Sequence, residues 1–187
     1  MQAEPNPLYF LVIANCIFVL EIYTMKIEII HSFANYNAWA NNILAKALLT
    51  ANEGQLEMEI ISSFPSIRKT LVHIHGAESI WVQRLASLPP YTFYKGTAGI
   101  STNEEITLWL SSSDKLKDYA LSLNEENLLE EKSVTNLKGE IFSNAVWQML
   151  MHCFNHSTFH RGQIITMLRQ VGVTAIPSTD LITYYRL

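Results

Sequence analysis

Residues 147–170 read WQMLMHCFNHSTFHRGQIITMLRQ, and their pattern decides the fold. Apolar residues recur at intervals of three and four, which is typical of a helix with one face packed on a core. His152, His156 and His160 follow one another at intervals of four, so they lie on one side of the predicted helix. A row of polar imidazoles is unusual on a helix that packs against a core, and metal binding is one possible explanation for it.

Three more stretches show the same helical spacing. The four expected helices cover residues 26–51, 63–87, 102 onward, and 144–170. Pro65 is tolerated in the first turn of the second helix, and Thr102 and Glu105 have the spacing of a capping box. Four amphipathic helices with little strand between them predict an all-α fold, an antiparallel four-helix bundle. A short β-hairpin is expected before the last helix, around Lys138 and Gly139.

Length and composition exclude several classes of protein. A chain of 187 residues is long enough for one domain with a proper core and short for two. Its formal net charge of −4 predicts no basic surface for nucleic acid. Two cysteines, Cys16 and Cys153, form no disulfide framework and no Cys-x-x-Cys pair, which favours a reduced, cytoplasmic location.

The first 24 residues differ from the rest, and we expect the bundle domain to cover residues 25–187. The apolar run LYFLVIANCIFVL, residues 8–20, is too short to span a membrane, which takes about 20 apolar residues. The segment before it holds Glu4 and no basic residue, so the criteria for a secretory signal are mostly unmet. Three interpretations remain open: a wrongly assigned start upstream of Met25, an added element packed on the domain, or a weak export or anchoring signal.

The row of histidines can give at most one pair of ligands to one ion. Positions four apart lie roughly 6 Å apart along a helix axis, so His156 and His160 can share an ion, whereas His152 and His160 are roughly 12 Å apart. Zinc or nickel needs three or four donors. His73, on the inner face of the second helix, is the best third ligand, and His75 should point away. The alternative is a set of core histidines with hydrogen-bonded nitrogens.

Three polar residues are candidates for supporting or substrate-binding roles. Gln163 lies one turn beyond His160 and could orient it. Asn37 interrupts the apolar face of the first helix, where an unpaired amide costs about 1–3 kcal/mol. Its partner could be a metal-bound water or substrate, or equally a backbone carbonyl or His152. His152 itself lies one turn from His156 and is expected to support the site.

Four strings carry a family resemblance: MKIEIIHSFANYNAWANNIL, SFPSIRKTLVHIHGAESIWVQRL, NHSTFHRGQIITMLRQVG and PSTDLITYYR. In this order they resemble the DinB family, over about residues 25–186. The resemblance implies a four-helix bundle, commonly a homodimer, that holds one divalent metal ion, often nickel or zinc, through three histidines. Carried over to the matching motifs, these ligands are His73, His156 and His160.

The resemblance also implies a range of activities. Characterised members of the family include transferases that use low-molecular-weight thiols such as bacillithiol or mycothiol. A divalent ion held by neutral imidazoles lowers the pKa of bound water and deprotonates a coordinating thiol. The sequence therefore favours a metal-dependent thiol S-transferase acting on small electrophiles. A hydrolase of small molecules, or a protein that binds metal or a small molecule without turnover, would need the same ligands.

Overall fold

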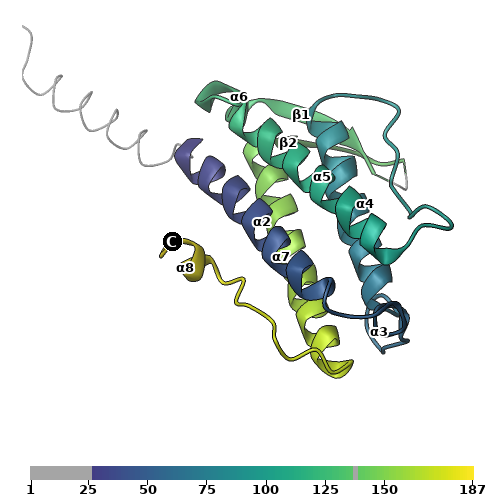
Figure 1. Cartoon of the computed structure of the whole chain (residues 1–187). Coiled ribbons are helices and arrows are strands. Elements are labelled where there is room, and N and C mark those ends of the chain that lie inside the picture. Colours follow the sequence, from purple (N-terminus) through teal and green to yellow (C-terminus); the bar gives the residue numbers. More distant parts are fainter. Residues whose placement is uncertain (1–26, 137–138) are drawn as a thin grey trace, which may run out of the picture.

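The computed structural model describes residues 27–136 and 139–187, and the structural statements below concern these residues. Its four long helices are Ile27–Leu48 (α2), Ile67–Leu85 (α4), Thr102–Leu121 (α5) and Val146–Gln170 (α7). They pack side by side (Figure 1), which confirms the predicted all-α bundle. The expectations for residues 1–24 lie outside the described residues and remain predictions.

Short elements join and extend the long helices. They are Glu53–Glu57 (α3), Glu125–Leu129 (α6), Glu131–Thr135 (β1), Ile141–Ala145 (β2) and Leu181–Tyr184 (α8). The two strands pair antiparallel, with Glu131 opposite Ala145, which confirms the predicted hairpin before the last helix. Beyond α7, the short helix α8 lies beside α2 (Figure 1). In the described part of the chain, no helix is both long enough and apolar enough to cross a membrane.

The four long helices form a ring in the order α2, α5, α4, α7, since α2 and α4 each pack against both α5 and α7. One core cluster joins the C-terminal halves of α2 and α7 to the N-terminal halves of α4 and α5, and a second joins the opposite halves. Two helices therefore run in each direction. Because α4 and α5 run the same way, residues 86–101 return along the bundle to connect them.

Two helices begin at slightly different residues from those predicted. Helix α4 starts at Ile67 because Ser66 caps it, accepting a hydrogen bond from a backbone N–H at 3.2 Å, so Pro65 precedes the helix. The capping box of α5 is formed by Ser101 and Glu104, one residue earlier than predicted. In both cases a serine hydroxyl satisfies a backbone N–H that has no partner within the helix.

Gly76 lets the returning loop, residues 86–101, lie directly against α4. A Cβ atom at Gly76 would overlap the carbonyl oxygen of Tyr94 and would lie 2.6 Å from the ring of Phe93. A Cβ atom at Gly162 of α7 would meet no heavy atom within 4 Å, apart from its own helix backbone. The two glycines therefore differ in whether a side chain fits.

We expect Gly76→Ala to lower the free energy of unfolding by about 1–3 kcal/mol, because the loop must move to admit the methyl group. Gly162→Ala is the matched control and should raise it by about 0.5–1 kcal/mol, since alanine is a better helix former. Urea denaturation followed by circular dichroism measures both. Two variants of equal stability would contradict the close approach of the loop.

Candidate metal centre

Three histidines meet between α4 and α7. His73 comes from α4, and His156 and His160 lie one turn apart on α7. The Nε2 atom of His156 is 3.1 Å from the Nε2 atom of His73 and 3.1 Å from that of His160. Two nitrogens bound to one tetrahedral zinc ion, each at about 2.0–2.1 Å, are roughly 3.3 Å apart. These three side chains could therefore hold one metal ion.

The hydrogen bonds of the three rings leave a place for a cation. His160 Nδ1 lies 2.7 Å from Gln163 Oε1, which can only accept, so Nδ1 carries the proton and Nε2 presents a lone pair. A single N–H at His156 Nε2 could point at only one of its two neighbours. His156 Nδ1 is buried without a hydrogen-bond partner in the described structure, so no neighbouring acceptor fixes which ring nitrogen of His156 carries the proton. Three neutral imidazoles therefore cannot place a hydrogen bond between both close pairs of Nε2 atoms. A metal ion at the centre would instead accept the lone pairs of all three.

Gln163 is placed to orient the ring of His160, because its Oε1 lies at the ring nitrogen that faces away from the other two histidines. Its Nε2 donates to Ser63 Oγ at 3.2 Å, and this contact directs its Oε1 toward His160. A ligating histidine almost always donates its other N–H to such an acceptor, which selects the tautomer that can bind metal. We propose that Gln163 has this role.

Burial keeps the three imidazoles neutral at physiological pH. Burial, and then repulsion from a charged His160, lower the pKa of His73 to about 4. Burial, and then repulsion from the neighbouring histidines, lower the pKa of His156 to about 4 as well. Burial also lowers the pKa of His160, against the opposing effect of its bond to Gln163. Since neutral imidazole is the form that binds metal, the site needs no deprotonation at neutral pH.

We therefore expect metal affinity to be kept as the pH falls through 6.5, the ordinary histidine value, and to be lost only at lower pH, because all three ligands have a lowered pKa. Protons compete with the ion only when the ligands are protonated, and His73 and His156 have a pKa of about 4. Unperturbed histidines would begin to lose affinity near pH 6.5. Calorimetric titration with zinc on both sides of this pH measures the effect, and a steady loss that starts near pH 6.5 would contradict it.

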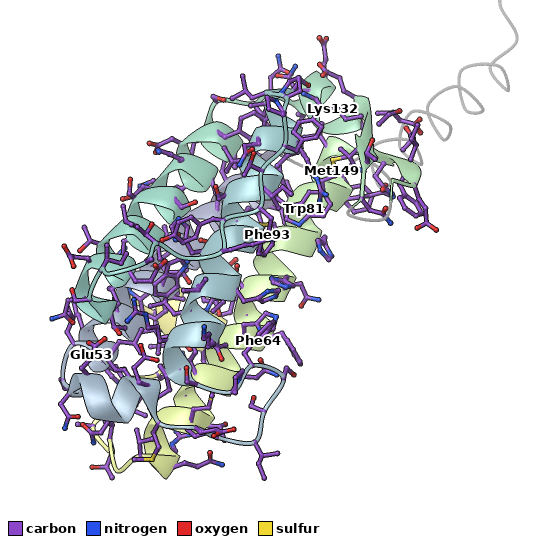
Figure 2. The ribbon with its side chains drawn as sticks, turned by 90° about the vertical axis from the view of Figure 1, so that its right-hand side faces the viewer. Glu53, Phe64, Trp81, Phe93, Lys132 and Met149 are labelled. Carbon is purple, nitrogen blue, oxygen red and sulfur yellow. The ribbon has the colours of Figure 1, made fainter. Side chains whose placement is uncertain are left out.

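Aromatic rings surround the three histidines. Phe64 stacks on His73 with ring centroids 4.2 Å apart, and the centroid of Phe93 is 6.0 Å from that of His73. Phe159 packs edge-on against His160 at 5.0 Å and is 61 % exposed. Figure 2 shows Phe64 and Phe93 at successive positions along one face of the molecule. Such walls exclude water from part of the site and strengthen the electrostatic interactions inside it.

Two other histidines of the same motifs lie outside this cluster. The ring of His152 is 5.9 Å from that of His156, and it packs edge-on against Trp81 at 5.1 Å. His75 points away from α7, as predicted, but it is buried against α5 instead of facing solvent. Its Nδ1 lies 2.8 Å from the carboxylate of Glu105. Neither ring joins the three converging nitrogens.

A buried polar network lies on the core side of α7, directly behind the histidines. Arg161 donates to the side-chain oxygens of Asn37 at 2.6 Å and Asn41 at 2.8 Å. Both asparagine amides donate in turn to Glu78 Oε1, at 2.9 and 3.0 Å. Ser157 donates to the same oxygen at 2.8 Å. The asparagines therefore bridge a buried cation to a buried anion across three helices.

This network changes the interpretation of Asn37. Its side chain is 1 % exposed, and its hydrogen bonds join Arg161 and Glu78, not His152 or a backbone carbonyl. We propose that Asn37 holds α2 against the two ligand-bearing helices and does not touch substrate. Sequence reasoning missed Asn41 and Glu78. A signal was present for Asn41, which lies four residues after Asn37 and so shares its helix face.

Comparison with known proteins agrees with this architecture. The model of the DinB family matches residues 24–186. Protein DinB of Bacillus subtilis (strain 168) is 30 % identical over 153 residues, which cover 76 % of this chain and 86 % of the relative. A solved DinB-like protein from Bacillus cereus ATCC 10987 has a TM-score of 0.61 at 17 % identity, covering 78 % of this chain and 94 % of that one. A DinB-like structure from Bacillus subtilis has a TM-score of 0.64 at 13 % identity, covering 79 % and 97 %. Since the family match spans most of its length, the chain belongs to the DinB family.

Proposed function

We propose that this protein binds one divalent ion, zinc or nickel, through His73, His156 and His160, and that it transfers a low-molecular-weight thiol to small electrophiles. The observation that supports the proposal is the convergence of three Nε2 atoms, with two separations of 3.1 Å. Three neutral ligands leave the ion its full positive charge and at least one open coordination position. When bound, such an ion lowers the pKa of a thiol or water molecule that ligates it.

The residues of the chain would then have separate tasks. The three histidines hold the ion, and Gln163 keeps His160 in the tautomer that presents Nε2. The network around Arg161 fixes the position of α7 relative to α4, so that the ligands from the two helices meet. His152 is exposed and lies beside His156, so it can contact a substrate that approaches the ion.

Two alternatives use the same ligands: hydrolysis of small molecules, and binding of metal or a small molecule without turnover. The proposed location is the cytoplasm, supported by the sparse use of cysteine. The proposed assembly is the homodimer that the family resemblance implies. We propose no role for nucleic acid or a membrane surface.

An activity screen tests the proposal. Zinc-loaded and nickel-loaded protein is given a panel of thiols, including bacillithiol and mycothiol, with monochlorobimane as the electrophile, and conjugate fluorescence is recorded. We expect turnover with at least one thiol, and its loss both in metal-free protein and in His156→Ala. Turnover that survives metal removal would contradict the proposal. A parallel panel of p-nitrophenyl esters tests hydrolysis, and fully loaded protein that is inactive in both panels would favour binding without turnover.

A further inference from the structure

A groove with a cavity of about 620 Å³ lies between α2, α7 and α8. Its walls include Phe33 and Tyr36 from α2, Trp147 and Met151 from α7, and Leu181 from α8. None of its lining residues is Asp, Glu, Lys or Arg. The three converging histidines lie where α7 meets α4, whereas this groove lies where α7 meets α2. The groove therefore lies at a different helix pair from the three ligands, and of the residues in the proposed function only His152 lies on its wall.

The chain also contains an apolar stretch that lies outside the described residues. Residues 8–20, LYFLVIANCIFVL, hold no charged side chain. A helix built from such residues would be apolar on every side, and an apolar surface of that size needs a cover. The stretch is also shorter than the roughly 20 residues needed to span a membrane by itself.

The connection between this stretch and the groove is short. Only residues 21–26 separate it from the start of α2 at Ile27, and six residues can reach roughly 20 Å when extended. Phe33, on the groove wall, lies only about 9 Å along the helix axis from Ile27. The stretch can therefore turn back and lie along α2 and α7. The tether would give it an effective concentration on the order of millimolar, an advantage over any free partner.

We propose that residues 8–20 dock into the groove between α2, α7 and α8 of their own chain. An uncharged apolar segment meets a groove in which apolar and aromatic side chains outnumber polar ones, and the apolar surfaces of both are removed from water. Docking uses none of the three metal ligands, so the disulfide test below gives its answer whatever the activity screen finds.

A native cysteine in the segment allows a direct test in the full chain. Cys16 lies within residues 8–20, and the other cysteine, Cys153, is fully buried, which raises the pKa of its thiol well above the ordinary value. Gln148→Cys and Asn155→Cys place a second thiol at exposed positions of the groove wall. Ser111→Cys is the matched control, because it is exposed on α5, which is not a neighbour of α7 in the ring. Each variant is oxidised with diamide, which takes up the two hydrogens of the thiols.

We expect both groove variants to form a disulfide with Cys16 within one chain, at least about tenfold faster than Ser111→Cys. Non-reducing electrophoresis and peptide mass spectrometry identify the product. Gln148→Cys loses a hydrogen bond at the start of α7, so circular dichroism checks its folding and Asn155→Cys keeps the test informative. A disulfide between two chains would place a second copy in the groove and overturn the proposal. Intramolecular oxidation no faster than in Ser111→Cys would overturn it as well.

Discussion

His160→Ala should contain almost no metal after purification, whereas the wild-type chain should contain close to one zinc or nickel ion. Among the described residues, His160 supplies one of three converging nitrogens, and the remaining pair cannot complete a site that needs three or four donors. His73→Ala should behave in the same way, because it removes the only ligand from α4. Elemental analysis by inductively coupled plasma mass spectrometry, normalised to protein concentration, measures the occupancy.

His152→Ala is the matched control for this experiment. It removes an imidazole from the same side of α7, but the ring lies outside the converging group, so metal should remain bound. An ion that joins α4 to α7 also stabilises the fold, by about 2.7 kcal/mol when its concentration is 100 times Kd. Chelation should therefore lower the melting temperature of wild-type protein and leave that of His160→Ala unchanged. Full occupancy in His160→Ala would contradict the assignment of the ligands.

Arg161→Ala should lower the free energy of unfolding by about 3–5 kcal/mol, because it removes the buried cation that Asn37 and Asn41 link to the buried carboxylate of Glu78. Arg161 is 1 % exposed, and its guanidinium also satisfies the side-chain oxygens of Asn37 and Asn41, which would lose their donor. Urea denaturation followed by circular dichroism measures the change.

Arg169→Ala is the control for Arg161→Ala, since Arg169 is an exposed arginine near the end of the same helix. Its removal should change stability by no more than about 0.5 kcal/mol. If Arg161→Ala cost less than about 1 kcal/mol, the network would not hold the helices together as described.

The long helices could be predicted because each buries one apolar face, and the residues that form such a face recur in the sequence every three to four positions. Helix α8 could not be predicted in this way, because its four residues are too few to show the spacing of an apolar face. Contacts with distant residues account for its position. Tyr184 packs on Trp39 with ring centroids 5.5 Å apart, and the Tyr36 hydroxyl donates to the carbonyl of Thr179 at 2.8 Å.

The histidine cluster could be predicted because spacing within one helix brings His156 and His160 together, and the inner face of another helix indicates His73. The buried network could not be predicted in the same way. A buried charge such as Glu78 is tolerated only when it is paired, and its partners come from α2 and α7 through contacts that no local pattern reveals. The lowered pKa of the ligands could not be predicted from the sequence either, because it results from burial, and burial depends on the packing of helices that are distant in sequence.

Anomalous diffraction from crystals of zinc-loaded protein, recorded at the zinc absorption edge, tests the central claim most directly. The account predicts one strong peak between α4 and α7, about 2.0–2.1 Å from the Nε2 atoms of His73, His156 and His160. A peak elsewhere on a fully loaded chain, with none within coordination distance of these three nitrogens, would contradict it.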